Sequence, residues 1–292
     1  MKRAKKSSAL YVSLLLYFGK IVRFFTSTSL FLVLNFVFVV YFSAVLYDVD
    51  VSPVILLLAF FMMFAIYSLN KVTDRVEDAI NKHSKNTKYH LCFLISAIVC
   101  YTIVPAIGLT LGTRVFLVLL IPLFIGFIYS VQLSKSLHRL KEMRGVKSVA
   151  VAFSWALPGA LLPALATTVA VEQIVLVFLY IFIQLFINTV LFDIIDMPGD
   201  RAAKIKTIPI QLGKTKTTYI LLIVNSLVIL WLSFCLTSGL FIKYLPVAAL
   251  GMLYSYGTIW YFPKHENKRL LADILIDGQW TLLLMFLWFF AR

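Results

Sequence analysis

The chain has 292 residues, of which 61% are hydrophobic and 14% are charged, and its formal net charge is +14. A soluble domain carries about 25% charged residues, so this composition is typical of a membrane protein and argues against a soluble globular protein. The net positive charge could suggest nucleic-acid binding, but its distribution along the chain indicates a different origin.

The apolar runs predict nine membrane-spanning helices, because each run is close to the roughly 20 residues needed to cross a hydrocarbon core. We place them at 22–47, 51–69, 89–107, 113–133, 147–170, 172–192, 216–240, 242–262 and 269–290. The runs are too long and too continuous for the strands of a membrane barrel. The sequence therefore predicts an all-α integral membrane protein, with nine transmembrane helices in a single bundle and one domain over residues 1–292.

The N-terminal arm, residues 1–20, combines a basic start with a short apolar patch. It lacks the cleavage site of a secretory signal, so we interpret it as an amphipathic helix on the membrane surface. With nine spans, 24 of the 27 Lys and Arg residues fall on one side of the membrane. This positive-inside pattern predicts a cytoplasmic N-terminus, and it explains the net charge without nucleic acid.

Neither thiols nor imidazoles suggest a catalytic or metal centre. Cys92, Cys100 and Cys235 all fall inside predicted spans and are interpreted as small buried hydrophobic residues. The four histidines lack the spacing of metal ligands.

A first polar cluster follows the second predicted span. Tyr67, Asn70, Asp74 and Asp78 are separated by three, four and four residues, which places them on one face of a continued helix. Two acids at this spacing repel each other. Either water surrounds them, or a cation holds them together.

A second cluster ends the sixth predicted span. Asp193, Asp196 and Asp200 stand there, with Asn188 upstream on the same helical stripe and Gln184 before it. Polar side chains inside a span usually face a bundle interior or a cavity rather than lipid. Pro198 and Gly199 are expected to end or bend the helix between the last two acids.

Two acid clusters at one depth on one side of the membrane suit a hard divalent cation. Mg²⁺ is usually held by a few carboxylates and shared with substrate phosphates. Both clusters are followed by Lys and Arg, which could grip a diphosphate and stabilise it as a leaving group. The alternative, that these bases only orient the chain in the membrane, also fits many of them.

These residues resemble the two aspartate-rich motifs of the UbiA superfamily of intramembrane prenyltransferases. The first motif is similar to Asn70–Asp78, with Asp74 between, and the second to Asp193, Asp196 and Asp200. A Tyr-Ser pair closing the fourth helix of the family is matched by Tyr129 and Ser130. The resemblance covers essentially the whole chain.

The resemblance implies Mg²⁺-dependent transfer of a prenyl group from a polyprenyl diphosphate to a lipophilic or aromatic acceptor within the membrane. It implies active-site loops on the cytoplasmic side and two or more Mg²⁺ ions bridging the diphosphate. By this resemblance, Asn70, Asp74, Asp78, Asp196 and Asp200 would hold the metal, and Tyr129 would join them in catalysis. The expected substrate contacts are Asp193, Ser130, Lys135, Arg139, Lys206, Tyr67 and Asn188.

Some features leave alternatives open. Lys71 replaces the acid that usually follows the Asn of the first motif, which removes a possible ligand. Asp273 and Asp277, entering the ninth span, could line the same cavity; for Asp273, pairing with Arg269 is the favoured interpretation. The acceptor could also be non-aromatic, such as geranylgeranylglyceryl phosphate or a carotenoid.

Two other classes of membrane protein fit the sequence less well. A transporter would spread its acids through the membrane midplane, whereas here they gather at one interface. A CDP-alcohol phosphotransferase would need an Asp-Gly-x-x-Ala-Arg motif, and Asp277–Gly278 continues differently. A prenyltransferase is therefore the predicted function.

Overall fold

A computed structural model describes residues 17, 19–20, 22, 24–74, 79–81, 89–134, 138–165, 167–265 and 268–291. Within these residues all regular structure is helical, which confirms the predicted all-α fold. The long helices are α2 (Leu30–Tyr47), α3 (Pro53–Thr73), α5 (His90–Leu111), α6 (Thr113–Ser130), α7 (Val146–Ala164), α8 (Val171–Ile195), α11 (Lys214–Thr237), α12 (Leu245–Tyr261) and α14 (Gln279–Ala291). The short ones are η1 (Leu140–Glu142), α9 (Met197–Ala202), α10 (Ile208–Leu212), η2 (Ile242–Tyr244), η3 (Phe262–Lys264) and α13 (Arg269–Leu275).

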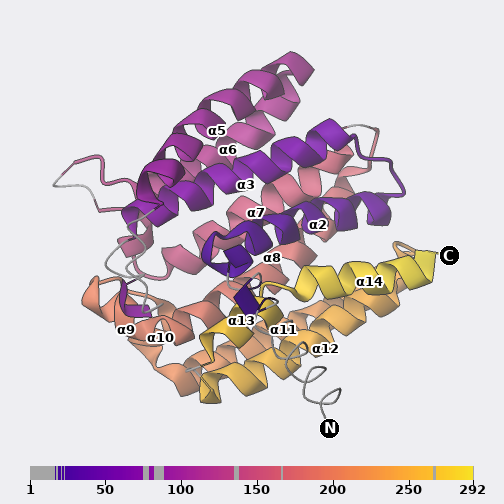
Figure 1. Cartoon of the computed structure of the whole chain (residues 1–292). Coiled ribbons are helices and arrows are strands. Elements are labelled where there is room, and N and C mark those ends of the chain that lie inside the picture. Colours follow the sequence, from indigo (N-terminus) through magenta and orange to yellow (C-terminus); the bar gives the residue numbers. More distant parts are fainter. Residues whose placement is uncertain are drawn as a thin grey trace, which may run out of the picture.

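The long helices form a closed ring in chain order (Figure 1). Each packs against the next, from α2 and α3 through α5, α6, α7, α8, α11 and α12 to α14, and α14 packs back against α2. Helix α2 also contacts α7, so it crosses the middle of the bundle. In Figure 1, α5 and α6 lie at the opposite edge of the bundle from α11 and α12.

Eight helical segments of the described chain are long and apolar enough to cross a membrane. The predicted span at 242–262 is not among them, because η2 and a proline in the first turn leave α12 with 17 residues. The count of nine spans and the cytoplasmic N-terminus therefore stay predictions. The predicted surface arm, residues 1–20, lies almost wholly outside the described residues.

The first predicted span begins later than expected. Helix α2 starts at Leu30, because a turn at Thr28 and Ser29 interrupts the helical backbone after residue 27. The Thr28 hydroxyl donates to the Phe24 carbonyl (2.7 Å), and Ser29 adopts a left-handed conformation with φ 61°. Hydroxyl side chains that bond to nearby backbone carbonyls compete with helix continuation, and this run of them ends the preceding segment.

Other predicted boundaries also shift. The span predicted at 147–170 ends at Ala164, and the one predicted at 172–192 continues to Ile195. The last predicted span, 269–290, is two helices, α13 and α14, separated by a turn at 276–278. These shifts matter because they bring polar residues to the helix ends that line a cavity.

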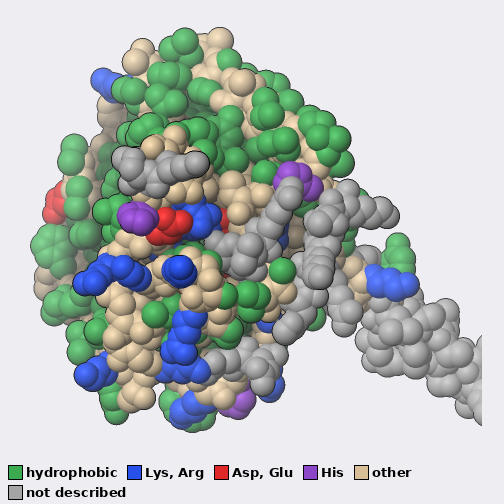
Figure 2. Space-filling view, turned by 90° about the vertical axis from the view of Figure 1, so that its left-hand side faces the viewer, with side chains coloured by type: hydrophobic (Ala, Val, Ile, Leu, Met, Phe, Trp, Pro, Cys, Tyr) green, Lys and Arg blue, Asp and Glu red, His purple; other side chains and the backbone are tan. Residues whose placement is uncertain are grey.

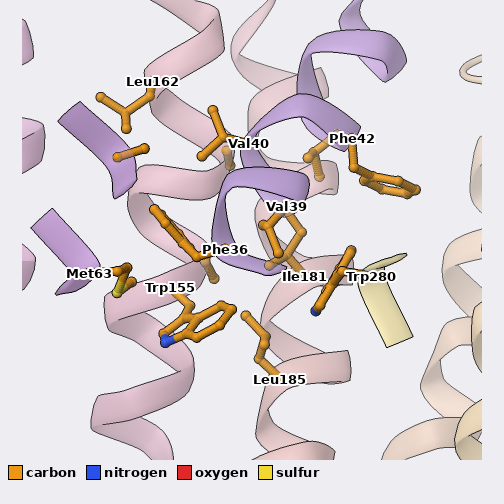
Figure 3. Packing of buried hydrophobic residues seen from close by; sticks show 14 of the residues in the cluster. Phe36, Val39, Val40, Phe42, Met63, Trp155, Leu162, Ile181, Leu185 and Trp280 are labelled. Atoms are coloured by element: carbon orange, nitrogen blue, oxygen red, sulfur yellow. The ribbon is translucent and has the colours of Figure 1, made fainter. Parts of the chain in front are cut away.

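The core lies between α2, α7 and α8 (Figure 3). Phe36 of α2 meets Trp155 edge-on, with ring centroids 5.3 Å apart, and Phe42 meets Trp280 in the same way at 5.4 Å. Gly159 lets α7 approach α2 closely, since a Cβ there would come within 2.7 Å of Val39 Cγ1. In lipid the surroundings are as apolar as the core, so close packing and interhelical hydrogen bonds hold such a bundle together.

A buried polar network joins α8, α12 and α14. Gln184 Oε1 accepts hydrogen bonds from Ser255 Oγ and from Gln279 Nε2, both 2.6 Å away. Gln279 Oε1 in turn accepts from Asn188 Nδ2 at 3.0 Å. This network fixes the start of α14, directly after the turn that divides the last span.

Candidate active site

Both acid clusters line a single cavity of about 920 Å³ at one end of the bundle. It lies where the loops that follow α3 and α8 come together. Figure 2 looks onto this end, where Lys and Arg side chains gather around a few acids. The structure thus brings together two motifs that are far apart in the sequence.

The first wall of the cavity is the C-terminal end of α3. The helix ends at Thr73, and Asp74 caps it by donating its backbone N–H to the Asn70 carbonyl. Asp74 Oδ1 accepts a hydrogen bond from Lys141 Nζ at 2.5 Å. The Ser130 hydroxyl donates to the Asn70 side-chain oxygen, which ties α6 to this wall.

Other predicted residues of the first cluster differ in their positions. Tyr129 is buried beside Ser130 and lines the cavity, within electrostatic reach of Asp74, Asp193 and Asp200. Asp78 lies outside the described residues. Lys71, the departure from the family pattern, also lines the cavity.

The second wall is formed by α8 and α9, with the start of α7 opposite. Asp193 is buried and accepts a hydrogen bond from Ser148 Oγ at 2.5 Å. Lys147 Nζ lies 2.9 Å from Asp193 Oδ1 and 2.8 Å from Asp200 Oδ2, so one cation serves two carboxylates. In a medium of low dielectric such pairing is what makes buried charge tolerable.

Asp200 is the acid most strongly affected by its surroundings. Burial, the largest cause, raises the pKa of Asp200 to about 7, with Lys147 opposing the rise and Asp193 adding to it. The ionised form of this carboxyl group therefore depends on a cation close by. A substrate-bound cation would favour the ionised form in the same way as Lys147.

The third acid of the second cluster, Asp196, is paired with the last span. The Arg269 guanidinium donates to Asp196 Oδ1, and its Nε donates to Asp273 Oδ1 at 2.8 Å. The predicted pairing of Asp273 with Arg269 is confirmed. Asp273 and Asp277 also line the cavity.

The loops of the two clusters touch each other through Asn81 and Gly199. The Gly199 N–H donates to Asn81 Oδ1 at 2.8 Å. A Cβ at position 199 would overlap the Asn81 amide as it stands, so the absence of a side chain at Gly199 permits this close approach. The contact holds the chain after α3 against α9 at the polar end of the cavity.

Of the three bases predicted to grip a diphosphate, the two that the structure describes do not line the cavity. Lys206 is exposed, and Arg139 pairs with Glu142 Oε1 at 2.6 Å. Lys135 lies outside the described residues and stays a prediction. Within the part of the chain that the structure describes, Lys141, Lys147 and Arg269 contact the acids of the clusters.

The sequence contains a signal for one base that was not predicted, Lys147. Lys147, Val151 and Trp155 follow each other at steps of four and all line the cavity. This is the spacing of one helical face, so Trp155 and Lys147 mark the same stripe of α7. Lys141 gave no such signal, because η1 breaks the helical register before α7.

The cavity continues from its polar end toward the apolar core. Trp155 Nε1 donates to the Tyr67 hydroxyl at 3.0 Å, and both residues line the wall. Asn188, predicted to bind substrate, also lines it, and its Nδ2 donates to the Ile276 carbonyl at 3.2 Å. Leu185, Val151 and Phe93 make the neighbouring surface apolar.

The donor chemistry at the polar end fits Mg²⁺, which prefers oxygen ligands. Carboxylates of Asp74, Asp196 and Asp200 and the amide oxygen of Asn70 all face the same cavity. Among the residues that the structure describes, no three acids, histidines or cysteines are close enough to enclose a metal ion alone.

The sequence of the chain matches a known protein family. Residues 33–290 match the model of the UbiA prenyltransferase family. The chain belongs to this family. The predicted family is thereby confirmed, and the protein is a prenyltransferase by family. With its apolar helices, it is an integral multi-pass membrane protein.

Solved structures of other UbiA proteins share the fold. A UbiA homolog from Archaeoglobus fulgidus bound to DMAPP and Mg²⁺ superposes with a TM-score of 0.64 at 16% identity, over 89% of this chain and 98% of that chain. The apo structure of a UbiA homolog from Aeropyrum pernix gives 0.62 at 14% identity, over 86% and 97%. A digeranylgeranylglyceryl phosphate synthase gives 0.50 at 15% identity, over 90% and 91%. No curated protein matches the sequence of this chain.

Proposed function

We propose that this UbiA prenyltransferase transfers the prenyl group of a prenyl diphosphate to a lipophilic acceptor within the membrane, with Mg²⁺ as cofactor. The proposal rests on one observation: a single cavity is lined by two walls of acids, by three bases and, farther in, by apolar side chains. A diphosphate fits the charged end, and a prenyl chain fits the apolar wall. The Archaeoglobus homolog bound to DMAPP and Mg²⁺ supports this assignment through the shared fold.

At the charged end, Asn70, Asp74, Asp196 and Asp200 would hold the metal, together with Asp78 as predicted from the sequence. When bound, Mg²⁺ would neutralise the oxygens of the diphosphate and make it a better leaving group. We assign the same task to Lys141, Lys147 and Arg269 in place of the predicted Arg139 and Lys206. Fixed cations in a water-poor site stabilise developing negative charge strongly.

Loss of the diphosphate leaves positive charge on the allylic carbon of the prenyl group. Aromatic faces attract cations, and Tyr67, Trp155 and Tyr129 all line the cavity. The hydrogen bond from Trp155 to the Tyr67 hydroxyl fixes the orientation of both rings. These rings would stabilise the cation until the acceptor attacks it.

The positions of the acids support the cytoplasmic orientation proposed from the sequence. The charged end of the cavity lies at the bundle end where α3 and α8 end, and in the sequence both helices are followed by segments rich in Lys and Arg. Basic loops remain on the cytoplasmic side during insertion. The diphosphate would then enter from the cytoplasm and the prenyl chain would extend toward the bilayer.

The test uses purified protein in lipid nanodiscs with geranyl diphosphate, Mg²⁺ and a panel of hydroxyl-bearing acceptors. Transfer should require Mg²⁺ and should disappear when a chelator is added. Asp196→Asn should lower transfer by about 10³-fold or more while the protein still inserts and folds, because the metal and Arg269 both lose a charged partner. Full activity of this variant, or transfer that persists without divalent cations, would refute the proposal.

A further inference from the structure

The cavity has two polar layers, stacked along four helical segments. The pairs, with the residue of the charged end first, are Asp74 and Tyr67 on α3, Lys147 and Trp155 on α7, Asp196 and Asn188 on α8, and Arg269 and Asp277 on α13 and the turn after it. The two members of each pair are seven or eight residues apart. At the rise of an α-helix this separates the layers by about 10–12 Å.

Asp277 is the charged member of the deeper layer. It stands in the turn at 276–278 between α13 and α14, where Gly278 donates its N–H to the Ile274 carbonyl at 3.0 Å. A Cβ at Gly278 would collide with that carbonyl oxygen, so the turn depends on glycine. Asn188 Nδ2 donates to the Ile276 carbonyl, which satisfies a backbone group that the turn exposes.

Asp277 lies among both aromatic and cationic groups. It acts electrostatically on the Tyr67 hydroxyl and on the Arg269 guanidinium. Trp155, Trp280 and Leu185 line the same cavity. A carboxylate at this depth in a membrane protein is costly unless it serves a polar partner in a cavity.

We propose that Asp277 binds the acceptor and that the acceptor is a neutral hydroxyl compound. The inference rests on the proposed function, because it names the second substrate of the same site. A carboxylate in a low-dielectric wall attracts an O–H donor and repels a second anion. The bases Lys141 and Lys147 belong to the other layer, where they contact the acids that flank the diphosphate.

The chemistry of the step balances with the residues present. The bond between the allylic carbon and the diphosphate oxygen breaks, and the diphosphate leaves with the electron pair. The acceptor hydroxyl oxygen forms the new bond to that carbon, and its proton passes to the Asp277 carboxylate. A positioned base of this kind typically contributes about 10²–10⁴-fold to the rate.

The test measures transfer from geranyl diphosphate to two matched pairs of acceptors. One pair is methyl 4-hydroxybenzoate and 4-hydroxybenzoate, and the other is hexadecylglycerol and its phosphate. We expect the wild-type protein to prefer the neutral member of each reactive pair by about 10-fold or more in kcat/KM. Preference for the anionic members, or no transfer to any of the four while the donor is cleaved, would overturn the inference.

Variants separate the role of Asp277 from a structural one. Asp277→Asn should lower kcat for the neutral acceptor by about 100-fold and reduce the charge preference, whereas Asp277→Glu should retain most of both. Asp48→Asn is the matched control, since Asp48 is exposed and caps α2 in a left-handed conformation that asparagine also favours. Wild-type rates in Asp277→Asn, or equal loss in the Glu and Asn variants, would show that Asp277 does not receive the acceptor.

Diphosphate release distinguishes this inference from the proposed function. If the wild-type protein releases no diphosphate from geranyl diphosphate and Mg²⁺, with any of the acceptors or without one, the proposed function fails. If it cleaves the donor but shows no preference for neutral acceptors, only the inference about Asp277 fails. Thermal shift with the four acceptors alone reports the charge preference independently of turnover, and stronger stabilisation by the anionic members would contradict the inference.

Discussion

The two acid walls of the cavity differ in how deeply their carboxylates are buried. Asp193 and Asp200, on α8 and α9, are each only 2% exposed and share the ammonium group of Lys147. Asp74, at the end of α3, has a side chain that is 21% exposed and pairs with Lys141, whose side chain is only 1% exposed. The α8 wall therefore presents fully buried carboxylates, whereas the α3 wall presents a partly exposed carboxylate at a helix end.

The difference matters because pre-organised charge needs no rearrangement during a reaction. A buried ion pair also makes the protein sensitive to loss of either partner, since the remaining charge is left without compensation. Changes in the α8 wall should therefore affect stability and activity together, and changes at Asp74 should affect activity more than stability. Four substitutions test this comparison, from the largest expected effect to the smallest.

Lys147→Met should have the largest effect. It leaves Asp193 and Asp200 without their common cation, and loss of one partner of a buried ion pair costs about 3–5 kcal/mol. We expect loss of transfer and a clearly lower temperature of unfolding in detergent. Lys206→Met, at an exposed lysine, is the control and should unfold at the wild-type temperature; equal melting of the two variants would contradict a fixed α8 wall.

Asp74→Asn should separate activity from stability. The carboxylate is 21% exposed, but Lys141 is only 1% exposed, so its ammonium group would stay buried beside a neutral amide. We expect the free energy of unfolding to fall by about 1–3 kcal/mol, less than for Lys147→Met. Transfer should fall by about 10²–10³-fold, because the charge faces the developing diphosphate. Both quantities are measured on one preparation, and a loss of stability as large as that of Lys147→Met would show that the two walls do not differ.

Gly199→Ala tests the contact between the two walls. The added methyl group would displace the Asn81 amide and break its hydrogen bond with the Gly199 N–H, at a cost of about 1 kcal/mol. We expect a moderate fall in transfer with an increase in KM for geranyl diphosphate. Gly257→Ala is the matched control, because a Cβ at that helical glycine meets nothing within 4 Å; an unchanged KM in Gly199→Ala would mean that the walls are positioned independently.

Arg139→Ala should have the smallest effect. Its ion pair with Glu142 lies near the surface, and such pairs contribute about 0–1 kcal/mol. Because Arg139 does not line the cavity, transfer should remain within about twofold of wild type, less than 1 kcal/mol in the barrier. A fall comparable to that of Asp74→Asn would instead support the role predicted for Arg139 from the sequence.

The sequence was sufficient to predict the class of fold and the acids that line the cavity. Continuous apolar runs indicate helices that cross a membrane, and the spacing of Asn70 and Asp74 places them on one helical face. Asp193, Asp196 and Asp200 were found from the same periodicity. This information is local, so it can be read without knowing how the helices pack.

The partners of these acids could not be predicted in the same way. Lys141, Lys147 and Arg269 approach the acids from other helices, and their choice depends on how the ring closes. From its charge alone, Arg139 was an equally good candidate for contacting the diphosphate. In the structure it pairs with Glu142, three residues farther along the chain. The break before α14 was also missed, because Asp277–Gly278 lies inside a run that is otherwise apolar and helical.

Closure of the ring by α14 against α2 bears on how the protein is made. The α3 wall is synthesised early, the α8 wall midway, and Arg269 last of all. Until α13 and α14 have entered the membrane, Asp196 lacks its arginine and α2 has an uncovered face. The cavity is therefore completed only at the end of membrane insertion, so a ribosome-bound intermediate that stops short of Arg269 should neither retain a prenyl diphosphate nor resist proteolysis in the loops at the charged end.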